Sequence, residues 1–211
     1  TDDLAPADCL VIKLLRSPHA HAKIKSIDTT IAKRIPGVEA IFTYKDVPAS
    51  RFTLAGQTYP EPSPYDRLIL DEVVRYVGDE VAIIAAKDEE SALKAMKLIR
   101  VDYEVYDAVL DFTKALAHPV IVHAEENYKL LCEIGNERRR NLHSHDESIV
   151  GDVDQAFAEC DVVLDREYHT KANAQAMMET FRSYAYMDTY DRLNVVSSTQ
   201  VPFHIRRMVA N

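Results

Sequence analysis

The sequence has few glycines and no long apolar run, and each shortage excludes a class of protein. With five glycines among 211 residues, it contains no G-x-G-x-x-G or G-x-x-x-x-G-K phosphate loop and no G-x-S-x-G nucleophile elbow. No apolar run reaches about 18 residues, so the sequence predicts no membrane-spanning helix. The usual signals of a nucleotide-binding loop, an α/β-hydrolase nucleophile and a membrane anchor are therefore missing.

Cysteine and positive charge are also scarce. Cys9, Cys132 and Cys160 are odd in number and far apart, whereas a disulfide framework or a zinc ribbon needs close pairs. We interpret them as reduced thiols and expect a cytoplasmic protein. The formal net charge of −9 argues against a nucleic-acid partner or an anionic membrane, because both need a basic face. The start, Thr1-Asp2-Asp3-Leu4, is neither basic nor an apolar signal core, and we expect that it lies inside a longer sequence.

What is present suits a globular protein with a packed core: 47% of the residues are hydrophobic and 28% are charged. In the first half, apolar runs and alternating patterns predict strands, and Asp88 caps the clearest helix, whose apolar face is Ala92, Leu93, Met96 and Ile99. A shorter helix is predicted from Asp28 or Thr29 through Ile35. The predicted strands are Cys9–Leu15, Lys23–Asp28, Val38–Thr43, Val73–Val77, Glu80–Ala86 and Val101–Val105.

These elements predict one compact α+β domain. Val73–Val77 and Glu80–Ala86 are separated only by a Gly78-Asp79 turn and are expected to form a hairpin. Residues 45–71 carry Pro48, Pro60, Pro62 and Pro64 and are expected to form a long extended loop, a candidate interaction surface.

The second half has weaker periodicity. Residues 107–151 read as a linker that wraps the surface, followed by a short helix at 152–157 and strands at 162–168, 176–188 and 193–198. This second unit has too few helices to cover its strands, so its apolar faces are expected to need another polypeptide surface.

Several polar groups allow two interpretations. His19/His21 and His143/His145 are metal ligands if they meet in space, and ordinary surface histidines otherwise. Arg138-Arg139-Arg140 suits either a phosphate or a solvated face, and Arg206-Arg207 suits a partner subunit. Glu179 is either a solvent-facing strand residue or a buried carboxylate that anchors a site. No local signature supports a Cys/His nucleophile pair.

The chain ends with a strand that runs into a capped helix. Val195 and Val196 favour a strand, Ser198 or Thr199 caps the helix, and Pro202 suits its first turn. Gln200 lies at the joint, where its amide both donates and accepts beside the unpaired N–H groups of a helix start. A polar ligand atom fits such a place, although Gln200 also reads as an ordinary amide at a helix terminus.

Segments along nearly the whole chain together resemble the molybdenum hydroxylases, the family of xanthine dehydrogenase and aldehyde oxidoreductase. The order and spacing of the segments carry the resemblance. The matching segments are Asp3-Leu4, Leu15–Ile24, Pro36-Gly37-Val38, Asp46-Val47-Pro48, Val74–Ala82, Val101–Glu104, Gly151–Phe157 and Ser198–Pro202.

The resemblance implies an α+β fold in which residues 1–110 form an α/β hammerhead domain and 111–150 a linker. Residues 151–211 are then the truncated start of an α+β molybdopterin-binding domain. In the family the glutamine of the Ser-Thr-Gln joint lies beside the molybdenum centre, and Gln200 matches it, so it is the expected cofactor-binding residue.

The family pattern is not fully present. Asn173-Ala174-Gln175 stands where many members have Gln-x-His before the glutamate that Glu179 matches. The Gly-Phe-Gly-Gly loop and the catalytic glutamate are expected beyond Asn211, so no catalytic set and no metal ligands are assigned, and the chain alone is expected to be inactive.

The resemblance implies part of an enzyme that hydroxylates a carbon of a purine, N-heterocycle or aldehyde with oxygen from water. The implied cofactor is molybdopterin, and electrons pass to iron–sulfur and FAD centres on partner domains or subunits. The implied partners are the remainder of the molybdenum-binding subunit, the iron–sulfur and FAD subunits and a small-molecule substrate. The alternatives are a non-catalytic assembly module with a hammerhead fold and a metallohydrolase built on the histidines.

Overall fold

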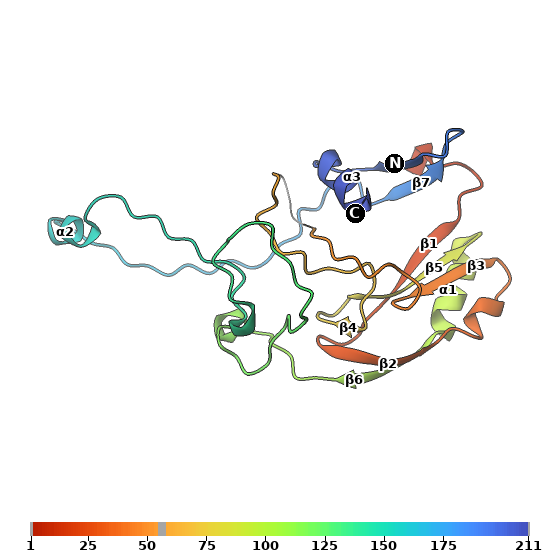
Figure 1. Cartoon of the computed structure of the whole chain (residues 1–211), viewed down its shortest axis with the longest axis horizontal. Helices are drawn as coiled ribbons and strands as arrows, with labels where there is room; N and C mark the ends of the chain where they lie inside the picture. The colour runs from red at the N-terminus through yellow and green to blue at the C-terminus, as the bar shows by residue number, and fades with distance from the viewer. Residues whose placement is uncertain (1, 55–57, 211) are drawn as a thin grey trace.

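The first 105 residues build two three-stranded antiparallel sheets. The structure, a computed structural model, describes residues 2–54 and 58–210, so residues 1, 55–57 and 211 lie outside it. One sheet has the order β1-β5-β3 and the other β4-β2-β6 (Figure 1). The first consists of β1 (Val11–Arg16), β5 (Glu80–Ala86) and β3 (Val38–Thr43), and the second of β4 (Val73–Val74), β2 (Ala22–Asp28) and β6 (Arg100–Val105).

Strand β5 is the centre of the core because both of its edges are paired and both of its faces are covered. Ala82, Ile84 and Ala86 point to one face and pack with Ala92 and Ala95 of helix α1 (Glu89–Leu98). Val81 points the other way and packs with β2 and β4 residues. This alternation follows from the two-residue period of a strand, and burial on both faces explains the nearly continuous apolar sequence of β5.

Helix α1 forms where its capping signal predicts. The Ser91 N–H donates to Asp88 Oδ1 at 2.7 Å. Ala92 and Ile99 of the predicted apolar face are buried, Met96 is partly buried against them, and Leu93 stays half-exposed. The predicted helix through Ile35 is shorter than expected, because only Ala32–Arg34 form a single 3-10 turn.

The predicted hairpin between Val73–Val77 and Glu80–Ala86 is wrong. Strand β4 has only two residues and pairs with β2, whereas β5 pairs with β1 and β3. A hairpin is impossible because both edges of β5 are already taken. The Arg75 N–H donates to Asp79 Oδ2 at 2.8 Å and Gly78 N–H to the Ser17 carbonyl at 2.8 Å, so the turn leads the chain from one sheet to the other.

The second half contains little regular structure. Besides the 3-10 turns Phe112–Lys114 and Arg138–Arg140, it has α2 (Val153–Ala158), the antiparallel pair β7 (Ser183–Met187) and β8 (Leu193–Ser197), and α3 (Pro202–Ala210). A further 3-10 turn, Asp2–Leu4, precedes β1 in the first half. The predicted strand at 162–168 is wrong, and the one at 176–188 begins only at Ser183. A strand needs a partner for its backbone groups, and none lies beside residues 162–168 in the ranges that the structure describes.

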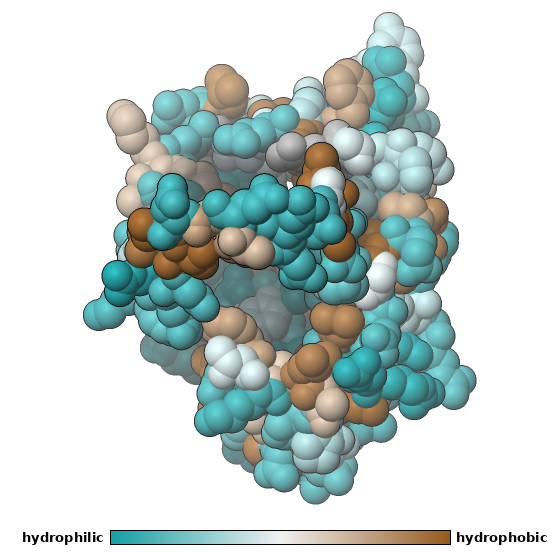
Figure 2. Space-filling view, turned by 90° about the vertical axis from the view of Figure 1, so that its left-hand side faces the viewer, coloured by the Kyte–Doolittle hydropathy of each residue, from teal (hydrophilic) through white to brown (hydrophobic). Residues whose placement is uncertain are grey.

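Residues 143–183 extend away from both sheets. Figure 1 shows this segment running out to α2 and back, and all of its residues are exposed, including Val150 at 91% and Leu164 at 74%. Figure 2, which faces the side from which α2 projects, shows brown apolar patches among polar side chains and a hollow behind them. The segment buries no core of its own, as the sequence predicts for the second unit.

No helix in the described ranges is long and apolar enough to cross a membrane. The extended loop at 45–71 is confirmed for its described residues, which form only isolated bridges, such as Phe52 with Arg67.

Candidate cofactor-facing joint and its anchor

The strand-to-helix joint forms as the sequence predicts. Strand β8 ends at Ser197, α3 begins at Pro202, and Gln200 is exposed between them. Thr199, one of the two predicted capping residues, accepts a hydrogen bond on Oγ1 from the Val201 N–H at 3.1 Å. The joint therefore has a fixed backbone path and presents the Gln200 amide outward.

The start of α3 favours a negatively polarised ligand. Its first turn contains no acidic residue, and the N–H groups of a first helical turn have no partner inside the helix. The aligned peptide dipoles add a partial positive charge at this end. Together with the amide of Gln200, these groups form a small donor-rich surface.

A buried carboxylate holds α3 against the first half of the chain. Glu61 lies in the proline-rich loop and is 0% exposed. Its Oε1 accepts from Arg207 Nη2 at 2.8 Å and from Arg207 Nε at 3.2 Å, and its Oε2 accepts from the Tyr65 hydroxyl at 2.9 Å. We call Glu61, Tyr65, His204 and Arg207 the Glu61 anchor.

His204 supplies the second contact of the anchor. It is 3% exposed, and its Nε2 donates to the Thr53 carbonyl at 3.1 Å. Its Nδ1 lies 3.4 Å from Glu61 Oε1 and makes no hydrogen bond to the described residues. Beyond Ile99, His204 is the single buried residue in the part of the chain that the structure describes.

The anchor keeps Glu61 ionised. Desolvation by burial raises the pKa of the carboxyl group, but hydrogen bonds from Arg207 and Tyr65 and the Arg207 charge outweigh it and lower the pKa to about 2. Burial, followed by the hydrogen bond to Glu61, raises the pKa of Tyr65 to about 12. The ion pair between Glu61 and Arg207 therefore persists over a wide pH range.

Sequence reasoning missed Glu61 and misplaced Arg207. Arg207, predicted to face a partner subunit, turns inward to Glu61 in the same chain, so that prediction is wrong for it. Arg206 is exposed and lies over the Phe203 ring at 5.6 Å. The available signal was Glu61 between two prolines in an otherwise uncharged stretch, and it does not reveal a partner 146 residues away.

An open apolar groove lies between β8 and α3. Its volume is about 500 Å³. The apolar part of its lining is Leu193, Val195, Pro202, Ile205, Val209 and Ala210. Apolar surface of this kind normally lies against other polypeptide or a ligand. We therefore infer that a partner surface or a ligand covers this side of the joint.

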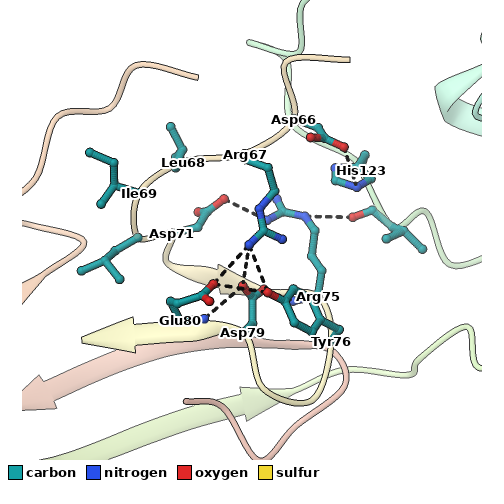
Figure 3. Close-up of a pocket in the computed structure, with 12 residues that line it drawn as sticks. Asp66, Arg67, Leu68, Ile69, Asp71, Arg75, Tyr76, Asp79, Glu80 and His123 are labelled. Atoms are coloured by element: carbon teal, nitrogen blue, oxygen red, sulfur yellow. Dashed lines mark hydrogen bonds and ion pairs between the residues drawn. The ribbon is translucent and has the colours of Figure 1, made fainter. Parts of the chain in front are cut away.

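A second pocket, of about 190 Å³, is built from paired charges (Figure 3). Arg67 Nη2 donates to the Tyr76 hydroxyl at 3.0 Å and to Glu80 Oε2 at 3.1 Å. Arg75 donates to Asp71 at 2.8 Å and to Glu125 at 3.1 Å. These pairs join three segments of the chain.

The carboxylates in and beside this pocket, of which Glu125 lies outside its lining, are held in place by their partners. Burial raises the pKa of Glu125, but the hydrogen bond with His123 and the Arg75 charge bring it down to about 2. Burial is also the main reason why the pKa of Asp79 is raised. Because the arginines and carboxylates are paired, we interpret the pocket as the clasp that docks the 122–125 segment onto the first domain.

The histidines and arginines singled out in the sequence lie apart. The His19 ring packs against Tyr103 at 4.9 Å and the His21 ring against Tyr106 at 5.3 Å. No group of three or more metal-type ligands is found within residues 2–54 and 58–210. Arg138 lies over the Tyr128 ring, and Arg140 pairs with Glu137 at 2.9 Å.

The remaining candidates are exposed or partly buried. Glu179 and the segment 173–175 are exposed. The interpretation of Glu179 as a buried carboxylate that anchors a site is therefore wrong. Cys9, Cys132 and Cys160 are free thiols.

With this geometry established, comparison with known proteins decides the family. Residues 1–107 match the family model for the a/b hammerhead domain of aldehyde oxidase and xanthine dehydrogenase, and residues 134–211 match the molybdopterin cofactor-binding domain. The chain belongs to the aldehyde oxidase and xanthine dehydrogenase family. The predicted hammerhead domain followed by the start of a molybdopterin-binding domain is thereby confirmed, whereas the boundaries at 110 and 150 stay a prediction.

The similar proteins are much longer than this chain. It is 38% identical over 233 residues to the probable hypoxanthine oxidase XdhD of Escherichia coli (strain K12), with 99% of the chain and 24% of the relative covered. It is 34% identical over 213 residues to the xanthine dehydrogenase molybdenum-binding subunit of Escherichia coli O157:H7, with 99% and 27% covered. The chain therefore spans about a quarter of the length of these relatives.

Solved structures show the same likeness. The aldehyde oxidoreductase from Desulfovibrio gigas superposes with a TM-score of 0.76 at 26% identity, covering 98% of this chain and 22% of that one. A Cu,Mo-CO dehydrogenase superposes with a TM-score of 0.75 at 30% identity, covering 100% and 26%.

Proposed function

We propose that this chain forms part of the molybdenum-binding subunit of a hydroxylase that acts on a carbon of a purine, N-heterocycle or aldehyde. Water supplies the oxygen atom, and the electrons pass to iron–sulfur and flavin centres on partner domains or subunits. Membership of the family and the joint at Gln200 support this proposal. The net charge of −9 favours a small-molecule substrate over nucleic acid.

The joint fits the implied cofactor. Gln200 is exposed, and its amide is able to donate to one electron-rich atom while it accepts from another. The N-terminal end of α3 beside it contains no acidic residue that would repel a negatively polarised group. When bound, the molybdenum cofactor supplies the redox chemistry that joins a water-derived oxygen to the substrate carbon.

The role of this chain in that chemistry is to bind the cofactor and to orient it. We propose that Gln200 donates a hydrogen bond to an oxygen of the molybdenum centre or to the cofactor. The groove between β8 and α3 and the exposed apolar residues of 143–183 are then covered by the remainder of the subunit, which also supplies the proton-transferring group. The isolated chain therefore has no turnover of its own.

The alternative is a non-catalytic assembly module. The uncovered apolar surface favours association with other polypeptide, whichever function is correct, and so does not separate the two. Only the hydroxylase requires the Gln200 amide itself, so a substitution at this position distinguishes them.

The test is Gln200→Ala in the complete, cofactor-loaded enzyme. Loss of one well-placed donor in a site lowers turnover on the order of a hundredfold, and we expect this loss with an unchanged molybdenum content. Lys97→Ala, which truncates an exposed side chain in the last turn of α1, is the control and is expected to be neutral. Wild-type turnover in Gln200→Ala would remove the proposed role.

A further inference from the structure

The Glu61 anchor connects the proline-rich loop to the helix that follows Gln200. His204 and Arg207 are three residues apart on α3 and therefore lie on one face of it. Both reach Glu61: Arg207 through two hydrogen bonds of 2.8 and 3.2 Å, and His204 through its Nδ1 at 3.4 Å. His204 also bonds the Thr53 carbonyl at 3.1 Å.

Much of the remaining surface of α3 is uncovered. Phe203 and Val209 are 68% and 55% exposed, and the groove toward β8 is open. The further contacts of α3 with the loop also come from Arg207, which donates to the Thr58 carbonyl at 3.4 Å and lies over the Tyr59 ring at 5.4 Å. The position of α3 relative to the first domain therefore depends mainly on His204 and Arg207.

A buried ion pair is a poor way to gain stability. Removing a carboxylate and a guanidinium from water costs several kcal/mol for each ion, and apolar side chains of similar size are often as stable or more so. What this pair provides is direction, because two N–H groups of the planar Arg207 guanidinium meet one oxygen of Glu61 while the Tyr65 hydroxyl meets the other. Such a pair suits a place where orientation matters.

We propose that Glu61 is a positioning residue for Gln200: it fixes the rotation and height of α3 and thereby the direction of the amide at the joint. Gln200 lies two residues before α3 begins at Pro202, and the Ile205 N–H donates to the Val201 carbonyl at 3.1 Å, which ties the residue after Gln200 to the first turn of the helix. His204 lies two residues into α3, about 3 Å of helix rise, so a shift of the helix at His204 moves the joint with it. A displacement of about 1 Å at a reacting centre is able to cost on the order of a hundredfold in rate.

This proposal rests on the function proposed above. It assigns Glu61 no contact with substrate or cofactor. A positioning role of Glu61 differs from a purely structural role in one respect. Loss of the Glu61 carboxylate must lower turnover only when the Gln200 amide is present.

The experiment is a double-mutant cycle in the complete enzyme, with Glu61→Gln, Gln200→Ala and the two combined. Turnover per molybdenum atom, KM, molybdenum content and the paramagnetic resonance spectrum of the reduced molybdenum centre are measured for each. We expect Glu61→Gln to lower kcat by tenfold to a hundredfold at unchanged molybdenum content and to shift the spectrum in the direction seen for Gln200→Ala. The double variant should be no slower than Gln200→Ala.

The controls separate the possible failures. Glu126→Gln, which neutralises an exposed glutamate, should match the wild type. If Glu61→Gln fails to fold, Arg207→Lys keeps the charge but loses the two hydrogen bonds of the planar guanidinium group to Glu61 Oε1, and it is judged by the same criteria.

Three results overturn the inference while leaving the proposed function intact. The first is wild-type turnover and spectrum in Glu61→Gln, and the second is multiplied losses in the double variant. The third is a loss of molybdenum with normal turnover per remaining atom, which identifies a folding role for Glu61. Unchanged turnover in Gln200→Ala overturns the proposed function and the inference with it.

Discussion

Replacement of Arg207 by alanine should release α3 from the first domain. The substitution leaves Glu61 buried without its main partner, and breaking a buried pair by removing one side costs about 3–5 kcal/mol. The Arg207 side chain is 34% exposed and that of Glu61 is 0% exposed, so water replaces part of the lost interaction. We therefore expect the lower end, about 3 kcal/mol.

Hydrogen exchange measured on peptides of α3 is the direct assay. Since 1.36 kcal/mol corresponds to a factor of ten, exchange of the α3 amides should accelerate on the order of a hundredfold, while α1 stays protected. Arg206→Ala is the matched control: Arg206 is exposed, and a surface change of this kind is worth within about 0.5 kcal/mol.

A double variant sharpens the test. Glu61→Gln combined with Arg207→Met leaves no unpaired buried charge, and the glutamine oxygen is still able to accept from the Tyr65 hydroxyl, so the double variant avoids the cost of burying a charge without a partner. This variant should exchange more slowly than Arg207→Ala. Equal exchange in Arg207→Ala and Arg206→Ala would show that the anchor contributes nothing to holding α3.

Two further predictions concern pH and the first domain. The pKa of Glu61 is lowered from 4.5 to about 2, so the anchor is fully present above pH 4.5 and is lost as the pH falls toward 2; the protection of the α3 amides, measured relative to their intrinsic exchange rate at each pH, should fall in that window, and constant protection would contradict it. Gly37 has a φ of +89°, and an added Cβ would lie 2.8 Å from Ser91 Oγ; Gly37→Ala should therefore lower the free energy of unfolding by about 1–3 kcal/mol in chemical denaturation, whereas no change would exclude strain at this turn.

Local signals in the sequence were enough for the elements of the first domain. The apolar run of β5, the alternation in β2 and the Asp88 cap each specify an element by the chemistry of adjacent residues. The joint at Gln200 is local too, because a β-branched pair, a threonine and a proline within eight residues define it.

The errors arise where the decisive partner is distant. The predicted hairpin failed because β5 pairs with β1 and β3, and sequence proximity to β4 does not reveal that competition. The predicted strand at 162–168 has β-forming residues but no neighbouring strand to complete its hydrogen bonds. Glu61 was overlooked because its burial depends on the ion pair with Arg207, and the sequence does not reveal a partner 146 residues away.

A structure of the cofactor-loaded subunit would show whether the Gln200 amide contacts the molybdenum cofactor in the complete enzyme. We expect the Gln200 side-chain nitrogen within about 3 Å of an electronegative atom of the cofactor or of its molybdenum ligands. A Gln200 side chain that points into solvent or bonds only to protein groups, with the cofactor bound elsewhere, would exclude the proposed role of Gln200.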